Sequence, residues 1–219
     1  MSSPGPGLGP WRDADAQLAA ASPAMAAAVA ALGPCRLVRR RAPGGTFGAL
    51  ARAICYQQLA GAAAAAIHAR FAALYGGCPT PAAVAATPAA ALRGAGLSAA
   101  KAAALADLAA RCLDGTVPAQ GWSRLGDDEV VERLATVRGV GPWTAQMFLV
   151  FQLNRPDVWP TGDLGVRAGF ARIHGLALPP PPRELAVLGE PYRPWRSVAA
   201  WYCWRAMEPP GVSSGGDPW

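Results

Sequence analysis

Apolar residues recur at intervals of three and four along nearly the whole chain, which is the spacing that places them on one face of an α-helix. No stretch alternates apolar and polar residues for long enough to predict a β-strand. Glycines, prolines and capping residues divide this pattern into segments. We predict helices over residues 11–32, 47–58, 61–75, 81–86, 88–94, 98–113, 127–136, 142–151, 163–174 and 193–207. The predicted fold class is therefore all-α.

The segments between these helices set the expected organisation. Thr46 precedes an apolar run and is predicted to be a helix N-cap. Residues 35–41 are predicted to form an extended connector, and the proline run 179–182 a stiff spacer. We expect one helical domain over residues 11–208, with a hairpin at about 127–151. The expected flexible ends are residues 1–10 and 209–219.

Composition places the chain among globular proteins. Hydrophobic residues make up 52% and charged residues 16% of the 219 positions, which is too apolar for a disordered chain. The apolar run around Ile54 is interrupted by Tyr56, Gln57 and Gln58, so it does not reach the roughly 20 apolar residues that a membrane helix needs. Residues 1–10 lack the basic start and apolar centre of a secretory signal. A cytoplasmic protein without a membrane partner is therefore expected.

The charge balance is a weak indication of nucleic-acid binding. The net charge is +6 and the isoelectric point is near 9.5. Of the 20 basic residues only Lys101 is a lysine, and an excess of arginine together with alanine is also typical of a GC-rich coding sequence. The positive charge alone therefore does not establish a DNA-binding protein.

Cysteine and histidine spacing gives no sign of a metal centre. The five cysteines lie 20 or more residues apart, so none forms the closely spaced pairs of zinc or iron–sulfur sites. His68 and His174 have no metal-like partner nearby in sequence. We expect reduced, mostly buried thiols and structural or surface histidines.

The most informative motif is the hairpin over residues 137–142, in which Gly139 and Gly141 flank Val140. Two glycines allow a tight turn, and Pro142 suits the first turn of the following helix. The amide groups at such a helix start are donors for an anion such as a DNA phosphate. A simple corner between two packed helices would have the same pattern, so the motif alone leaves both interpretations open.

Asp163 lies 22 residues beyond Gly141, at a predicted helix start where an aspartate is an ordinary N-cap. Hairpin, helix, loop and aspartate together resemble the helix-hairpin-helix superfamily of DNA glycosylases. Within it, the sequence is most similar to the 3-methyladenine DNA glycosylase II family, the alkylbase DNA glycosylases. The resemblance extends over residues 45–208. Its three blocks are residues 47–71, 134–170 and 194–202.

This resemblance implies a compact form of the family without the additional N-terminal β-rich domain of larger members. It implies two lobes with the active cleft between them. The N-terminal helices would complete the lobe that carries the C-terminal helix.

The resemblance also assigns the chemistry. The catalytic aspartate falls on Asp163, whose carboxylate would stabilise the positive charge on the deoxyribose and help water attack C1′. Relatives that also cut the strand have a Schiff-base lysine two residues after the second glycine, where this chain has Trp143. Lys101 lies in a different predicted helix, as a surface charge or a phosphate contact. A monofunctional enzyme without lyase activity is therefore expected.

An alkylated purine is electron-poor and usually cationic, which favours stacking on aromatic rings. The resemblance places a base pocket at Trp143, Met147 and Trp204, with Tyr56, Trp201 and Tyr202 as further candidates. Ordinary core packing is the alternative for each of them. For Trp195 packing is the favoured interpretation, and Arg196 is expected either at the site or paired with a carboxylate.

Further residues are implied in DNA binding. Gln58 and Leu59 match the segment that enters the minor groove and fills the space of the flipped base, although a leucine at a helix break is often a core residue. Gly139, Val140, Gly141 and Thr144 would contact phosphate through the hairpin. Ser98 and Lys101 resemble a phosphate-facing helix start, and an N-cap beside a solvated lysine is the alternative. The main-chain carbonyls of Ala135, Val137 and Val140 would hold a monovalent cation, Na⁺ or K⁺, and no other cofactor is required.

The predicted function is base excision repair: hydrolysis of the N-glycosidic bond of 3-methyladenine or 7-methylguanine flipped out of duplex DNA, leaving an abasic site. The partner would be double-stranded DNA containing damaged bases, bound by a monomer at the nucleoid. Two alternatives are a glycosylase for another lesion, such as ethenoadenine, hypoxanthine or an oxidised base, and a helix-hairpin-helix module that binds DNA without catalysis.

Overall fold

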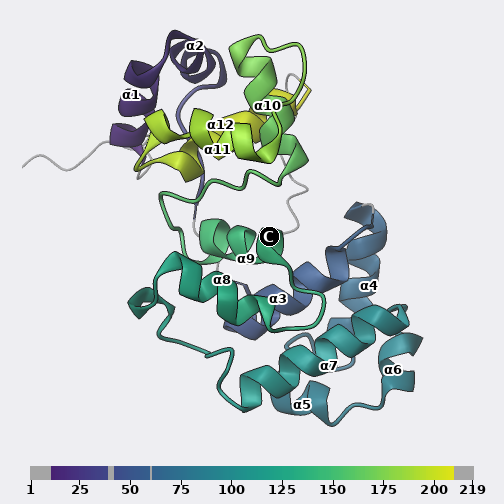
Figure 1. Ribbon diagram of the computed structural model, residues 1–219. Coiled ribbons are helices and arrows are strands. Elements are labelled where there is room, and N and C mark those ends of the chain that lie inside the picture. The colour runs from purple at the N-terminus through teal and green to yellow at the C-terminus, as the bar shows by residue number, and fades with distance from the viewer. Residues whose placement is uncertain (1–10, 39–41, 60, 210–219) are drawn as a thin grey trace, which may run out of the picture. The chain divides into compact units, whose positions relative to one another are not determined.

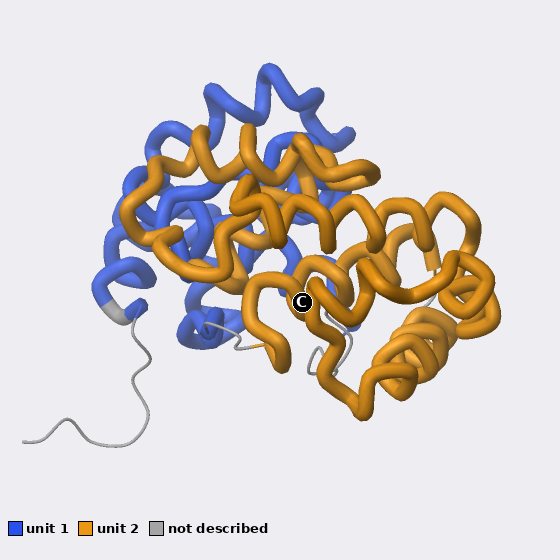
Figure 2. Tube along the Cα trace, turned by 90° about the horizontal axis from the view of Figure 1, so that it is seen from below, with its two compact units in different colours: residues 1–38, 154–214 blue, residues 39–153, 215–219 orange. Residues whose placement is uncertain are grey.

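The computed structural model describes residues 11–38, 42–59 and 61–209. Every regular element within these ranges is helical (Figure 1), which confirms the all-α prediction. The chain divides into two compact units (Figure 2): residues 1–38 with 154–214 form unit 1, and residues 39–153 with 215–219 form unit 2. Of the expected flexible segments 1–10 and 209–219, residues 1–10 and 210–219 lie outside the described residues.

Unit 1 joins the two ends of the chain. Its elements are α1 (Arg12–Ala21), α2 (Pro23–Leu32), α10 (Leu164–His174), α11 (Pro182–Leu188), the 3-10 turn η3 (Glu190–Tyr192) and α12 (Arg196–Met207). Helix α12 is buried along most of its length and packs against α10, α2 and α1. The N-terminal helices therefore share a unit with the C-terminal helix, as predicted.

The closest approach in unit 1 is between α10 and α12. A Cβ atom added at Gly169 would lie 1.9 Å from the main-chain oxygen of Cys203, so only glycine fits there. Helix α12 is also linked to the N-terminal helices, because the Tyr202 hydroxyl donates to Asp15 Oδ1 at 2.8 Å. These contacts fix α12 between helices that are distant in sequence.

The start of α12 is held by an ion-pair network. The guanidinium of Arg196 donates to both carboxylate oxygens of Asp157, at 2.7 and 3.0 Å, and Glu190 lies 3.2 Å away. Of the two roles expected for Arg196, at the site or paired with a carboxylate, the structure shows the pairing with a carboxylate. Trp195 packs edge-on against Trp11 and donates to Gln17, which confirms the packing interpretation.

Unit 2 is built around α7. Its elements are α3 (Gly45–Tyr56), α4 (Gly61–Ala73), α5 (Pro81–Ala85), α6 (Ala89–Gly94), α7 (Ala99–Leu113), the 3-10 turn η1 (Trp122–Arg124), α8 (Asp127–Ala135), α9 (Pro142–Met147) and the π-helical η2 (Phe148–Gln152). Helix α7 buries Leu105 and Leu108 against α3, α5 and α6. Ser98 caps it as predicted, because its hydroxyl accepts the Lys101 amide at 3.2 Å.

Three local predictions were wrong. The predicted helix over 11–32 is two helices, because Ser22 is extended and caps a new helix at Pro23. Gly44, in the left-handed region, is the N-cap of α3 in place of Thr46, whose hydroxyl bonds Ala119 and Trp122 instead. The proline run 179–182 is not only a spacer, because its last residue, Pro182, begins α11, a helix that was not predicted.

No helix within the described ranges is long and apolar enough to cross a membrane. The connector over 35–41 is irregular as far as residue 38, and residues 39–41 lie outside the described part of the chain.

Candidate active site

Asp163 is the N-cap of α10. Its Oδ1 accepts the Val166 amide at 2.8 Å and the indole Nε1–H of Trp204 at 3.0 Å. The residue is 9% exposed, and a buried carboxylate needs such donors to compensate for lost hydration. The positive end of the α10 dipole also favours the anion. The structure therefore combines helix capping with a charged group held in one orientation.

The contact between Asp163 and Trp204 depends on how closely α10 and α12 pack. A Cβ atom at Gly165 would lie 3.0 Å from Trp204 Cδ1 and 3.1 Å from Asp163 Oδ1. Gly165 and Gly169 are four residues apart and so lie on one face of α10. Two glycines on the face toward α12 leave the space through which the indole reaches the carboxylate.

The other aromatic candidates of unit 1 differ in exposure. Trp201 is partly exposed, and the Arg205 guanidinium lies 5.9 Å from its ring centre. Tyr202 is fully buried, and its hydroxyl bonds Asp15 and the Gly33 carbonyl. The structure thus places Tyr202 in the core, where it links α12 to the N-terminal helices and has no surface available to a base.

Cys203 lies between these residues and is also buried. Burial, with a smaller contribution from the negative charge of Asp163, raises the pKa of its thiol far above the ordinary value. The thiol is therefore protonated at neutral pH and is not a nucleophile.

The predicted hairpin of unit 2 forms at residues 137–142. Val140 donates its amide to the Val137 carbonyl at 3.0 Å, and Gly139 has a φ of +77°, which favours glycine. Gly141 is the N-cap of α9, and Pro142 begins the helix. Helix α9 runs directly into η2, so the helical segment extends from 142 to 152, one residue beyond the prediction.

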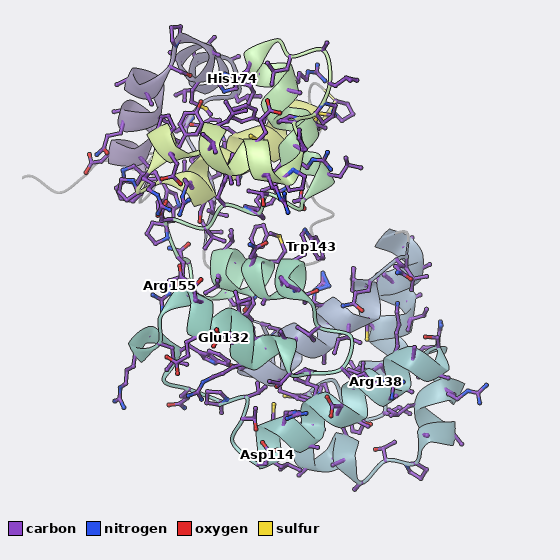
Figure 3. All side chains as sticks on the ribbon, viewed as in Figure 1. Asp114, Glu132, Arg138, Trp143, Arg155 and His174 are labelled. Atoms are coloured by element: carbon purple, nitrogen blue, oxygen red, sulfur yellow. The ribbon has the colours of Figure 1, made fainter. Side chains whose placement is uncertain are left out.

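The side chains that follow the hairpin point to different places. Trp143 is 40% exposed and lies on α9 (Figure 3). Thr144 and Met147 are 3% and 2% exposed, so both belong to the interior of unit 2. Of these three candidates, Trp143 is the one with a substantial exposed surface.

The segment 57–59, which we call the wedge turn, follows α3 directly. Gln58 adopts a positive φ of 56°, uncommon for a residue with a side chain, and it is exposed. Leu59 is 41% exposed, so the alternative of a core leucine is wrong. The Gln57 amide donates from Nε2 to the Gly139 carbonyl at 2.9 Å and links this turn to the hairpin.

A pocket of about 380 Å³ lies beside the wedge turn and the hairpin. Its lining residues are Ala53, Tyr56, Gln57, Gln58, Gly139, Trp143 and Thr144. Tyr56 is fixed by Arg52, whose guanidinium lies 4.1 Å from the ring centre, and by His68 at an edge-on contact of 6.1 Å. Arg52 was not predicted as a site residue, although its spacing of four residues from Tyr56 in the predicted helix 47–58 is a signal for this contact.

One alternative for Lys101 was a solvated surface charge, and the structure shows a partly buried side chain instead. Its Nζ donates to the Cys55 carbonyl, in the last turn of α3, at 2.7 Å. Burial lowers the pKa of Lys101 below its ordinary value, while burial raises the pKa of the Cys55 thiol to about 12. The only lysine therefore caps a helix C-terminus in unit 2, away from the hairpin position of a Schiff-base lysine.

Asp107 is a residue that the sequence analysis missed. Its Oδ2 accepts the Arg138 amide of the hairpin at 2.7 Å (Figure 3 labels Arg138). An aspartate in mid-helix has many surface roles, so no local pattern distinguishes this one.

The main-chain carbonyls assigned to a cation lie at the end of α8 and in the hairpin. Helix α8 ends at Ala135, so this carbonyl lies in the last turn, where intrahelical donors run out. The Val137 carbonyl accepts one amide and has a second lone pair. Within the described residues no group of three or more histidine, cysteine or carboxylate side chains could hold a metal.

Comparison with known proteins places this arrangement in a family. The model of HhH-GPD superfamily base excision DNA repair proteins matches residues 51–194. The DNA-3-methyladenine glycosylase 1 of Schizosaccharomyces pombe is 37% identical over 180 residues, which cover 80% of this chain and 77% of the relative.

Solved structures agree with this match. The structure of the 3-methyladenine DNA glycosylase of Schizosaccharomyces pombe in complex with abasic DNA has a TM-score of 0.80 and 33% identity, over 88% of this chain and 95% of that one. The DNA-3-methyladenine glycosidase of Bacillus halodurans has a TM-score of 0.77 and 28% identity, over 88% of each chain. The hairpin, the capped aspartate and these matches together show that the chain belongs to the HhH-GPD superfamily of base excision DNA repair proteins.

Proposed function

We propose that this protein is a monofunctional DNA glycosylase that removes alkylated purines, such as 3-methyladenine and 7-methylguanine, from duplex DNA. The observation that carries the proposal is Asp163, a buried carboxylate whose Oδ1 is held by the Val166 amide and the Trp204 indole. Relatives named for 3-methyladenine, from Schizosaccharomyces pombe and Bacillus halodurans, support the substrate class.

The reaction needs a fixed negative charge. Cleavage of the bond between C1′ and the purine nitrogen leaves positive charge on the deoxyribose, and the bonding electrons leave with the base. The Asp163 carboxylate stabilises that charge, and water adds at C1′ and loses a proton. Because Oδ1 is held by two donors, the carboxylate does not have to reorganise as the charge develops. The product is an abasic site.

Strand cleavage by a Schiff base requires an amine nucleophile. Trp143 occupies the position that the resemblance gives to such a lysine, and Lys101 donates to the Cys55 carbonyl on another helix. The chain therefore supports hydrolysis at the sugar without lyase chemistry.

The aromatic residues support a preference for electron-poor bases. Tyr56 and Trp143 border the unit 2 pocket. In unit 1 Trp204 donates to Asp163, and the partly exposed Trp201 lies on the same helix as Trp204. Alkylation at N3 or N7 gives the purine a positive charge, which strengthens stacking on such rings and weakens the glycosidic bond. Leu59, exposed on the wedge turn, would fill the space that the flipped base leaves.

Replacing Asp163 by asparagine tests the mechanism. Asparagine is an equally good N-cap, so Asp163→Asn removes the charge and keeps the α10 start. We expect release of 3-methyladenine from methylated duplex DNA to fall by at least about 10³-fold, as for other losses of a charged catalytic group. Binding to abasic-site DNA should persist.

The matched control is Asp13→Asn, an exposed carboxylate of the same unit, which should keep full base release. Unchanged release by Asp163→Asn would refute the mechanism. A lesion panel containing ethenoadenine and hypoxanthine, tested in parallel, decides whether alkylated purines are the preferred substrates.

We also propose that a monomer acts on nucleoid DNA in the cytoplasm, because the aspartate and the hairpin are both supplied by one chain. The carbonyls of Ala135, Val137 and Val140 would hold Na⁺ or K⁺ and add positive charge beside the phosphate-binding amides. Neutral carbonyl oxygens suit such ions better than transition metals. Sedimentation of the protein with abasic DNA, in K⁺ and in a large organic cation, tests the stoichiometry and the cation.

A further inference from the structure

One face of α7 contacts both segments that are proposed to touch DNA. Lys101, Ala104 and Asp107 are spaced three residues apart and therefore lie along one side of the helix. Lys101 contacts the end of α3 next to the wedge turn, while Ala104 and Asp107 contact the hairpin. All of these residues belong to unit 2.

The contact of Lys101 holds the helix end from which the wedge turn starts. Its ammonium donates to the Cys55 carbonyl at 2.7 Å, and Gln57 is the next residue but one. A cation at a helix C-terminus binds orphan carbonyls and complements the negative end of the dipole. The contact is partly buried, so water does not readily replace it. The starting point of the wedge turn is therefore fixed relative to α7.

The hairpin lies on the same helix, one turn further along. A Cβ atom on Gly139 would lie 3.5 Å from Ala104 Cβ, an ordinary van der Waals contact. Asp107 accepts the amide of Arg138 at 2.7 Å, a bond strengthened by the charge of the carboxylate. These two contacts fix the position of the hairpin main chain along α7.

A third bond joins the two segments directly. Gln57 donates from its side chain to the Gly139 carbonyl at 2.9 Å. The following residue, Gln58, has the positive φ that a side-chain residue adopts only when its surroundings impose it. The wedge turn, the hairpin and α7 therefore form a closed set of contacts.

We propose that Gln57, Lys101 and Asp107 are positioning residues that set the distance between the wedge turn and the hairpin. This inference rests on the proposed glycosylase function. A wedge unstacks a base efficiently only when the hairpin holds the neighbouring phosphate at a matching position. Loss of one contact should therefore weaken base unstacking more than it weakens non-specific binding, which depends on charge.

The test measures unstacking without requiring base release. The full-length protein is titrated into a duplex that contains an abasic-site analogue next to 2-aminopurine, whose fluorescence rises when it is unstacked. Gln57→Glu, Lys101→Met and Asp107→Ala each remove one contact. We expect the fluorescence change at saturation to fall at least about twofold for each variant. Because each replacement changes the net charge by one, affinity for an undamaged duplex should follow that charge, falling for Gln57→Glu and Lys101→Met but not for Asp107→Ala.

Conservative variants separate positioning from general folding. Asp107→Asn keeps an acceptor for the Arg138 amide and Lys101→Arg keeps a cationic donor, so both should recover most of the unstacking signal. Asp114→Asn is the matched control: Asp114 lies at the C-terminus of α7, where it accepts the Thr116 amide at 2.8 Å, and this variant should match the wild type.

Base release in single turnovers provides the second measurement. With methylated DNA and excess protein, the variants should lower the maximal rate about tenfold and leave the half-saturating concentration nearly unchanged. If the wild type releases base and the variants unstack 2-aminopurine as fully as it does, the positioning role is refuted while the glycosylase function stands.

If the wild type releases no base but unstacking still depends on these residues, the glycosylase function fails and the positioning role stands. If Asp107→Ala does not fold, the unstacking signal of Gln57→Glu decides whether the positioning role stands. Gln57 is half-buried at the end of α3, so this replacement removes the amide donor without opening the core.

Discussion

At the scale of single residues, Asp163 both caps α10 and is the proposed catalytic carboxylate. A buried aspartate in this place needs hydrogen-bond donors, and the Val166 amide and the Trp204 indole supply them. The sequence predicted Asp163 at a helix start, but Trp204 was predicted only as a wall of a base pocket. Its bond to Asp163 joins residues 41 positions apart, which no local pattern reveals.

Removal of the indole donor should slow base release. Trp204→Phe keeps an aromatic ring but loses the Nε1–H bond to Asp163 Oδ1, so the carboxylate is less well oriented. A hydrogen bond to a charged group contributes about 1.5–3 kcal/mol, which corresponds to a rate loss of about tenfold or more. Single-turnover release from methylated DNA measures this effect. Trp195→Phe is the control, because it also removes an indole N–H bond, to Gln17, from a tryptophan that packs outside the site. Equal losses for both variants would contradict the orienting role.

At the scale of elements, glycines decide which helices approach each other. Gly165 and Gly169 allow α10 to lie against Cys203 and Trp204 of α12, whereas Gly139 is needed for the left-handed φ of the hairpin. The sequence showed glycines in helices and turns but not their partners. The break at Ser22 was also not predicted, because the apolar spacing continues across it, although a serine followed by Pro23 is a typical start of a new helix.

Adding one methyl group at the α10–α12 contact should weaken the fold. In Gly169→Ala the new Cβ would lie 1.9 Å from the Cys203 oxygen, so the helices must separate. We expect the free energy of unfolding to fall by about 2–3 kcal/mol, at the upper range for overpacking. Urea denaturation measures it. Gly94→Ala, where no atom lies within 4 Å of the new Cβ, is the matched helical control and should be neutral or slightly stabilising.

At the scale of the whole molecule, the chain leaves unit 1 after the N-terminal helices and returns to it after unit 2. The bond from Tyr202 to Asp15 spans 187 residues and fastens this return. His174 lies in the same unit, stacked on Phe170 at 4.2 Å and within 2.9 Å of the Tyr192 hydroxyl (Figure 3 labels His174). These contacts show that stability of unit 1 depends on both ends of the chain.

Stability should fall in mild acid. Burial lowers the pKa of both His68 and His174 below 6.5, so the unfolded chain binds more protons than the folded one as the pH falls through that value. Stability is therefore greatest above pH 6.5 and declines below it. Thermal melts at pH 7.5 and 5.5 measure the decline, and His174→Gln should reduce it. An identical decline in the variant would exclude His174 as a source.

The sequence by itself determined the all-α class, most helix limits, the glycine hairpin and the capped aspartate, because helix periodicity and capping depend on residues a few positions apart. Together with a family resemblance, these features were sufficient for the proposed chemistry. Tertiary structure alone decided that Tyr202 is a core residue, that Lys101 binds Cys55, and that Asp107 holds the hairpin. Each of these depends on which helix faces which, and that follows from the packing of the whole core.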